Sequence, residues 1–547
     1  MNDRTSLPWL RRPVDRTRRS GRVLFIGLDA AEPLLLQRWA AEGALPAIAA
    51  LLREGQLATP DCPTGLGNGG TWPAVFTGMS AATNGRYYYQ RFDADSYRHV
   101  DFDHDLDYAL PTFWTLASDA GKRVAVIDMM RGPLATSING MQIADWLTHG
   151  SLLPPRSTPS PLIEHVIHEF GADPWHGHSD DNYHAAADKN PATWLDATLR
   201  RVDSKGACSE RLLAAEDWDI FATTFSELHD FGHLFWHAHD STHPAFDADR
   251  FARDGDPLKA VYRAVDRWVG RLIDQAGPGT HVMLFTGPGM GPNYTANRAL
   301  DDILLRLEGS YSSLPLRRRA VGWSRSAYKV MVPSAVRTRL NLRQRMAAVT
   351  SAAPNAFDPH SLSSRLFFPL MNNDNAGAVR LNLQGRESRG RVTPAEAAPL
   401  LRRLVDDLRA IVNAETGEPL IREIVETGKT YSGPRLDQLP DLFLVWNRPR
   451  PIRKVASPRI GRITVPQDPI RTGDHNERML LAFRPASASD TSIDGSSLRA
   501  EDIAPTLLDL TGVPTTVRFD GVSRVRDETE PVRAGLGPVR NRGNVRA

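Results

Sequence analysis

The sequence predicts an α/β fold in which helices flank a doubly wound, mostly parallel β-sheet. Short continuous apolar runs recur along the chain, and such runs are typical of strands that are buried on both faces. Stretches with helical spacing of apolar residues alternate with several of these runs, which favours parallel strands joined by helices. The composition agrees, because 41% hydrophobic and 24% charged residues are ordinary for a globular protein.

Each element follows from a local pattern. A strand is expected at 23–28, where an apolar run ends at the carboxylate of Asp29. One helix is expected over 32–52, because Pro33 suits a first turn and Gly55 suits a stop. The remaining expected strands lie at 122–129, 218–225, 281–286, 440–446 and 479–483, and the remaining helical stretches at 113–120, 257–275 and 502–511.

The 547 residues are expected to form one elaborated domain at 22–525. Two stretches that break the alternation, at about 150–215 and 311–370, are interpreted as insertions that cap the strand ends. The second carries basic clusters, for which a solvated helix face is the first interpretation and a nucleic-acid surface the alternative. Low apolar content predicts a disordered tail at 526–547.

Residues 1–21 contain two arginine pairs, which an export signal can also carry. Such a signal would need an uncharged apolar segment after the arginines, but Asp29 and Glu32 interrupt the run that follows. We therefore predict a basic flexible arm, a cytoplasmic location and no membrane as a partner.

The charge and cysteine content exclude several classes of partner and site. Lys and Arg number 66 and Asp and Glu number 64, so a formal net charge of +2 gives no overall field that would draw in nucleic acid as an obligate partner. Cys62 and Cys208 are the only cysteines, which is too few for a disulfide framework or a thiolate metal cluster. A bound metal would need His, Asp or Glu ligands.

The strongest local signal is the segment ELHDFGH at 227–233. His229 and His233 are four residues apart, so in a helix they share one face, and this spacing suits two ligands of one metal. A His-rich polar loop is the alternative interpretation. Glu227 and Asp230 are possible auxiliary groups at this site.

Two further residues have both a structural and a chemical interpretation. Asp29 ends a core strand, where a carboxylate either caps the following helix or binds a metal. Thr71 follows the glycine-rich segment 65–70 and precedes Pro73, so we expect it at a helix N-terminus. There it is a plain N-cap or, where a metal lowers the hydroxyl pKa, a nucleophile. His475, after a turn, is a weaker signal.

Several segments, in colinear order over roughly residues 22–521, are similar to segments of the alkaline phosphatase superfamily. They are IGLDAAEP, TWPAVFTGMSAATNGRYYY, SELHDFGHLFWHAHD, LPDLFLVW, RTGDH and DIAPTLLDLTGVP. The chain most resembles the type I phosphodiesterase / nucleotide pyrophosphatase branch. The resemblance implies hydrolysis of a small-molecule phosphoester or phosphodiester by a Ser or Thr nucleophile that two divalent metals, usually zinc, flank.

Residue by residue, the resemblance implies that Thr71 is the nucleophile. It implies that Asp29, His229, His233 and His475 are metal ligands, with the three histidines forming one zinc site that keeps an open position.

The other metal site departs from the family pattern, which reads Asp-His-Gly-Met after the fourth strand. Here the segment reads GPGM, so Gly287 and Pro288 stand at degenerate ligand positions. Asp29 and Thr71 alone are too few ligands to hold a second cation tightly.

Three hypotheses follow for the activity. The protein is a hydrolase with one metal, or with a second ion that the substrate and carboxylates such as Asp61 or Asp230 help to hold. Alternatively, it is a catalytically impaired pseudoenzyme or ligand-binding protein on the same fold. In the third hypothesis, the three-histidine site runs other chemistry, for example with a metal-bound hydroxide as nucleophile.

Overall fold

The computed structural model describes residues 21–102, 110–148, 153–175, 191–309, 357–373, 375–468, 470–487 and 491–526. The expected arm at 1–21 and tail at 526–547 lie outside the described residues, except for Gly21 and Arg526. No helix within the described ranges combines the length and the apolarity that crossing a bilayer requires.

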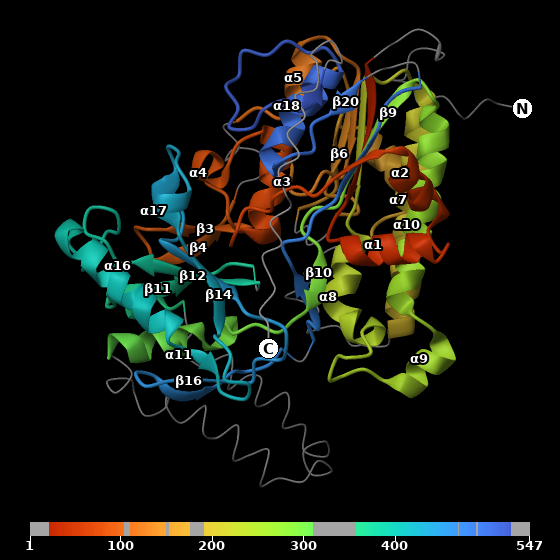
Figure 1. The fold of residues 1–547 in the computed structure, drawn as a ribbon. Coiled ribbons are helices and arrows are strands. Elements are labelled where there is room, and N and C mark those ends of the chain that lie inside the picture. The colour runs from red at the N-terminus through yellow and green to blue at the C-terminus, as the bar shows by residue number, and fades with distance from the viewer. Residues whose placement is uncertain are drawn as a thin grey trace, which may run out of the picture.

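An eight-stranded sheet forms the centre of the molecule (Figure 1). From edge to edge its strands are β2 (Gln56–Ala58), β19 (Leu481–Arg484), β9 (Thr280–Phe285), β1 (Arg22–Leu28), β8 (Ile220–Phe225), β5 (Val124–Ile127), β6 (Gly140–Ala144) and β7 (Arg156–Thr158). The strands from β9 to β6 run parallel, whereas β19, β2 and β7 are antiparallel to their inner neighbours. The predicted doubly wound, mostly parallel sheet is therefore confirmed.

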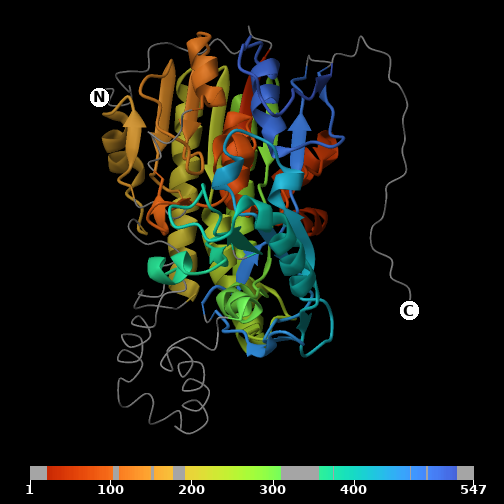
Figure 2. The same cartoon turned by 90° about the vertical axis from the view of Figure 1, so that its left-hand side faces the viewer.

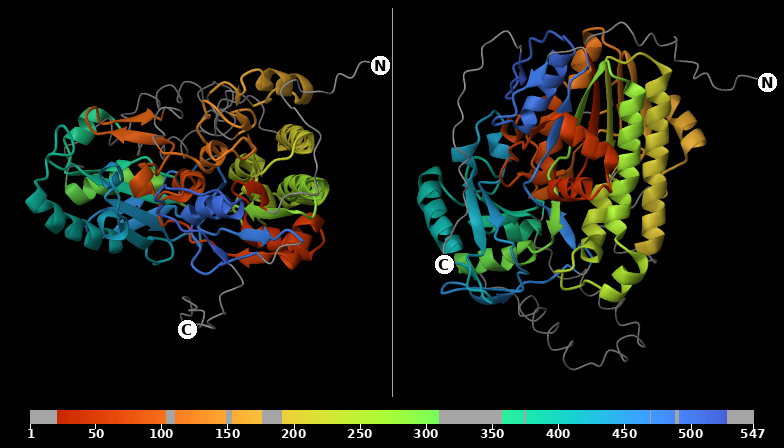
Figure 3. Two further views of the ribbon diagram at one scale, coloured as in Figure 1. Left: turned by 90° about the horizontal axis from the view of Figure 1, so that it is seen from above. Right: turned by 45° about the vertical axis from the view of Figure 1, so that its right-hand side comes forward.

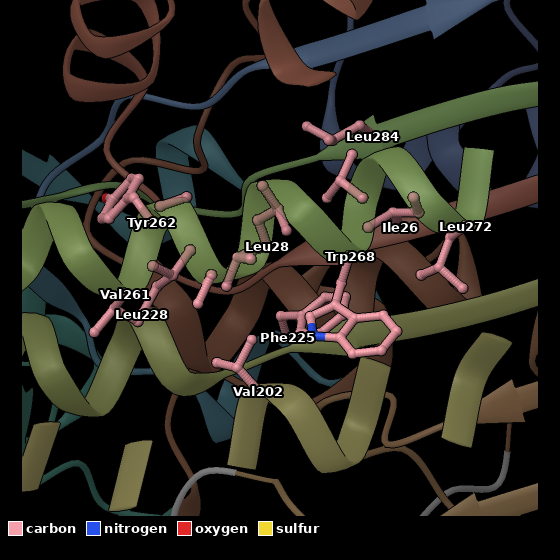
Figure 4. Close-up of a cluster of buried hydrophobic side chains, with 14 of the residues drawn as sticks. Ile26, Leu28, Val202, Phe225, Leu228, Val261, Tyr262, Trp268, Leu272 and Leu284 are labelled. Carbon is pink, nitrogen blue, oxygen red and sulfur yellow. The ribbon is translucent and has the colours of Figure 1, made fainter. Parts of the chain in front are cut away.

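One face of the sheet is covered by α1 (Pro33–Ala41), α2 (Pro46–Glu54), α7 (Pro191–Ala215), α8 (Glu227–His239) and α10 (Pro257–Ala276). Helix α10 turns a stripe of apolar residues at helical spacing toward the strands. Figure 4 shows this contact, in which Ile26, Leu28, Phe225 and Leu284 of the sheet lie among Val202 of α7, Leu228 of α8, and Val261, Tyr262, Trp268 and Leu272 of α10.

The opposite face of the sheet is covered by α3 (Gly67–Thr77), α5 (Phe113–Asp119) and α18 (Ile503–Leu510). These helices pack against Phe25, Val126 and Phe285, which are fully buried. Because both faces carry helices, the central strands are apolar on both sides, as the continuous apolar runs predict.

The single helix expected at 32–52 is wrong, because the chain forms α1 and α2 there. Gly43 adopts a φ of 75°, a left-handed conformation that ends the first helix at little cost only for glycine. Pro46 then begins α2, where its fixed φ suits the first turn.

Within the stretch at 150–215, the described residues 153–175 and 191–215 belong to the central layers rather than to a cap over the strand ends. Its β7 pairs with β6 at the sheet edge, and α6 (Leu162–Phe170) and α7 pack on the core. Helix α7 lies beside α10 (Figure 3). The polar composition conceals this position, because few residues of α7, among them Val202, Cys208 and Leu212, are both apolar and buried.

A second, antiparallel sheet lies beside the central one (Figure 2). Its strands are β11 (Phe367–Leu370), β12 (Ala376–Leu381), β15 (Leu442–Trp446) and β14 (Ile421–Glu426), with α11 (Asn297–Glu308) and α16 (Pro394–Arg409) packed on it. The strand expected at 440–446 therefore exists, but in this smaller sheet. Of the insertion expected at 311–370, residues 311–356 lie outside the described residues.

We predict that Gly206→Ala destabilises the protein. An added Cβ at Gly206 in α7 would lie 2.1 Å from the indole of Trp268 in α10, closer than any real contact. Overpacking of this kind lowers the free energy of unfolding by about 1–3 kcal/mol, which urea denaturation would measure.

The matched control is Gly428→Ala in α17 (Thr427–Thr430), where an added Cβ meets nothing within 4 Å. Alanine also favours helix, so this control should be neutral or slightly stabilising. Equal free energies of unfolding in the two variants would contradict the close packing of Gly206 in α7 against Trp268 in α10.

Candidate metal centre

The carboxyl ends of three neighbouring parallel strands bring the candidate residues together. Asp29 directly follows β1, and α8 begins two residues after β8. After β9 comes β10 (Met290–Pro292), which pairs with β18 (Gly473–His475) so that His475 lies opposite Met290. The expected convergence of these strand ends is confirmed.

A close contact between backbones places β18 directly on α8. The amide of Thr472 donates to the carbonyl of His233 at 2.7 Å. An added Cβ on Gly473 would lie 2.2 Å from the carbonyl oxygen of Gly232, so only glycine fits at this position. His475 is thereby held against the helix that carries His229 and His233.

His229, His233 and His475 form a compact buried cluster. One ligand atom of each lies within 4.8 Å of the others, and their side chains come from α8 and β18. Their exposed fractions are 3%, 0% and 2%, respectively. Within the described part of the chain, this is the one group of three or more His, Cys, Asp or Glu residues close enough to hold a metal ion.

The Nδ1 atom of each histidine faces an acceptor outside the cluster. Nδ1 of His233 lies 2.8 Å from the carbonyl oxygen of Gly473, and Nδ1 of His475 lies 3.4 Å from that of Pro288. Nδ1 of His229 lies 2.9 Å from Oδ2 of Asp29. Acceptors at these distances favour the tautomer protonated on Nδ1, which leaves Nε2 as the ligand nitrogen, the usual arrangement around a protein-bound metal.

Burial keeps two of the imidazoles neutral. Burial, followed by the nearby Arg471 guanidinium, holds the pKa of His233 well below its usual range. Burial, followed by the neighbouring His229, does the same to the pKa of His475. A neutral imidazole is the form that binds a metal.

Asp29 contacts the cluster from outside rather than joining it. Its Oδ2 faces Nδ1 of His229, and its Oδ1 accepts a hydrogen bond from the indole Nε1 of Trp72 at 2.8 Å. The carboxylate is fully buried. In this position it orients His229 instead of supplying a fourth ligand atom.

Trp72 lies beside Gly287, one of the two positions where the family pattern has side-chain ligands. An added Cβ on Gly287 would lie 3.4 Å from the Trp72 ring, and an added Cβ on Gly27 would lie 2.8 Å from it. Pro288 presents its carbonyl oxygen to His475. Gly287 and Pro288 carry no side chain that can bind a metal, whereas the three histidines offer the donor set that one metal needs.

Thr71 does not lie at a helix N-terminus, so that expectation is wrong. Helix α3 begins at Gly67, one turn earlier, and Thr71 is buried in its interior, where its hydroxyl donates to the carbonyl of Gly67 at 2.7 Å. The sequence hid this start, because glycines are poor helix formers. Packing holds the start in place, since Asn373 donates to the carbonyl of Leu66 at 2.8 Å.

Glu227 and Asp230 face a buried charge network behind α8. Oε1 of Glu227 lies 3.2 Å from Nζ of Lys205, which also lies 3.5 Å from Asp128. Asp230 accepts a hydrogen bond from Arg201 at 3.2 Å. Both auxiliary carboxylates are thus paired with cations from α7.

Asp61, the other carboxylate considered for a second ion, is exposed. Its backbone forms an isolated β-bridge with that of Arg499.

Three contributors escaped the sequence reasoning: Trp72, Arg471 and Lys205. Trp72 and Arg471 lie inside TWPAVFTG and RTGDH, two segments that carry the family resemblance. Nothing in their spacing distinguishes them as site residues. Lys205 is one of few lysines in the chain and falls on the apolar side of an otherwise amphipathic helix. That departure from the helical pattern was the available signal.

Comparisons with known proteins agree with this architecture. A family model described as type I phosphodiesterase / nucleotide pyrophosphatase matches residues 23–468. Phosphonoacetate hydrolase from Sinorhizobium meliloti 1021, solved in complex with phosphonoacetate, aligns with a TM-score of 0.50 at 13% identity, over 91% of this chain and 97% of that one. Murine ectonucleotide pyrophosphatase / phosphodiesterase 5 aligns with a TM-score of 0.45 at 10% identity, over the same shares. No curated protein sequence matches the chain.

We predict that Lys205→Met strongly destabilises the protein. Lys205 is fully buried, and its loss would leave the carboxylates of Asp128 and Glu227 without their nearest cation. Breaking a buried pair in this way lowers the free energy of unfolding by about 3–5 kcal/mol, measured by urea denaturation.

Lys259→Met is the matched control, because Lys259 pairs with the exposed Glu42 on the surface. Lys259→Met should lower the free energy of unfolding much less than Lys205→Met does, because exposed ion pairs stabilise little. A comparable loss of stability in both variants would contradict a structural role for the buried ion pairs of Lys205.

Proposed function

Because the chain belongs to the type I phosphodiesterase / nucleotide pyrophosphatase family, we propose that it is a phosphoester hydrolase with a single metal site. The observation that carries this proposal is the buried cluster of His229, His233 and His475 beside Gly287 and Pro288, which carry no ligating side chain. The proposed substrate is a small-molecule phosphoester or phosphodiester.

The proposed metal is a divalent ion, with zinc as the first choice. Three imidazoles with a fourth position for water or substrate are a donor set that catalytic zinc uses. When bound, the metal would act as a Lewis acid that polarises a phosphoryl oxygen.

The chain's own residues support this site in three ways. Asp29 and the carbonyl oxygens of Gly473 and Pro288 hold the three rings by their outer nitrogens. Burial excludes bulk water from the cluster, which strengthens electrostatic interactions with a bound phosphate. Arg471 adds a positive charge beside His233.

Thr71 is not the proposed nucleophile. Its hydroxyl is buried and donates within α3, and the first turn of that helix, with sequence GNGG, contains no hydroxyl group. The proposed nucleophile is water, which would form the new phosphorus–oxygen bond while the ester bond breaks and the alcohol leaves.

The same placement of Thr71 favours a second candidate function, a ligand-binding protein without turnover. In the family pattern, the hydroxyl nucleophile and the second metal act together, and here Thr71 and the region around Trp72 and Gly287 both depart from it. Such a protein would bind phosphoesters at the histidine cluster and release them unchanged.

We predict one metal per chain, lost in His475→Ala. Removal of one of three ligands lowers metal affinity steeply, because two imidazoles hold zinc weakly. Elemental analysis after dialysis measures the stoichiometry, and aryl phosphomonoester and phosphodiester substrates measure turnover. His239→Asn is the control, since His239 ends α8 but pairs with Asp256.

Two metals per chain in the wild type would contradict the interpretation of Trp72 and Gly287. One metal with no turnover on any phosphoester would select the binding protein over the hydrolase.

We also predict that Thr71→Ala leaves the hydrolysis rate unchanged. The variant loses only a hydroxyl that is bonded to the Gly67 carbonyl. Loss of a true nucleophile would instead lower kcat by several orders of magnitude. A rate collapse in a variant that still binds its metal would overturn the water mechanism.

A further inference from the structure

Arg471 is the cation that touches the candidate metal centre. It precedes β18 by two residues, and its backbone is fixed on both sides. Its amide donates to Oδ1 of Asp468 at 3.1 Å, and its carbonyl accepts from Nδ2 of Asn293 at 3.0 Å. The next amide, of Thr472, donates to the carbonyl of His233. The guanidinium is therefore held over the histidine cluster by a well-anchored segment.

The guanidinium lies against the ring of His233. Nη2 of Arg471 lies 3.0 Å from Nδ1 and 3.0 Å from Nε2 of His233. An atom equally close to both ring nitrogens lies over the face of the imidazole, so the guanidinium stacks on the His233 ring. The in-plane lone pair of Nε2 remains available to a metal, and the positive charge of Arg471 lies close beside it.

A second arginine nearby does not share this position. Nη2 of Arg448 donates to the carbonyl of His475 at 2.6 Å, and its Nη1 lies 3.7 Å from Asp474. These contacts engage the Arg448 guanidinium with the backbone and a carboxylate of β18. Arg471 is the one of the two that contacts a ligand ring.

We propose, on the basis of the single-metal function above, that Arg471 is the anion-binding residue of this site. Its guanidinium lies against the face of His233, and with metal bound it would donate to a phosphoryl oxygen of the substrate. The planar guanidinium matches a phosphate geometrically.

The consequence is coupled binding of metal and phosphate. A divalent cation and a guanidinium at the same imidazole repel each other, and an anion between them removes the repulsion. Each ligand should therefore tighten the other, because coupling between two sites is reciprocal.

The test is zinc affinity, measured by competition with a chromophoric chelator, with and without inorganic phosphate. In the wild type, phosphate should tighten zinc binding by about tenfold, within the usual range of such couplings. In Arg471→Met, zinc alone should bind about tenfold tighter than in the wild type, since the repulsion between the guanidinium and the divalent cation is gone. Phosphate should then have no further effect.

Two controls isolate the charge and the position. Arg298→Met removes an arginine of α11 that pairs with Asp468 beside the same segment, and it should leave both measurements unchanged. Arg471→Lys keeps the charge without the planar fork, so the phosphate effect should persist in weakened form.

The outcomes separate this inference from the function on which it rests. Weaker zinc binding in Arg471→Met would show that Arg471 only supports the fold, and an unchanged phosphate effect would show that it does not bind the anion. Either result overturns the inference alone. Absence of zinc binding by the wild type would overturn the proposed function and the inference with it.

Discussion

The site depends on one close approach between two backbones, where β18 rests on α8 with Gly473 against Gly232. No side chain larger than hydrogen fits at Gly473, since an added Cβ would lie 2.2 Å from the carbonyl oxygen of Gly232. This contact joins a helix that follows β8 to a strand that arrives almost 250 residues later. The three imidazoles meet because these backbones meet, and the parallel strands β1, β8 and β9 set where that happens.

The departures from the family pattern form one physical change rather than several. Without side-chain ligands at Gly287 and Pro288, a buried Asp29 would have no cation beside it, and an unpaired buried charge is costly. The indole N–H of Trp72 and the ring of His229 supply partners for its two oxygens. The indole also lies beside Gly287, where an added Cβ would be 3.4 Å from the ring. A carboxylate expected as a metal ligand thus contacts a histidine of the candidate metal centre.

The sequence predicts those features that depend on a local pattern of residues, and it misses those that depend on tertiary packing. Continuous apolar runs located β1, β8 and β9, and the four-residue spacing of His229 and His233 identified their shared helical face, because both patterns are local. His475 was identified as a candidate ligand through the resemblance to the family rather than through a local pattern. The helix start at Gly67 escaped, because tertiary packing overrides the poor helix propensity of glycine there. The place of α7 escaped for a related reason, since its buried side includes Lys205 and Arg201, which are read as exposed in a sequence.

The buried cations of α7 help to fix the position of α8, the helix that carries His229 and His233. Lys205 reaches the carbonyls of Leu147 and Thr224 at 2.8 and 3.0 Å as well as the carboxylate of Glu227. It thereby ties the loop after β6 and the end of β8 to the first turn of α8. A buried ion pair adds little net stability over an apolar contact, but it permits few alternative arrangements, because each displaced charge would be left unpaired. Ligand rings tolerate little displacement. The charges behind α8 therefore serve the placement of His229 and His233 more than the overall stability of the fold.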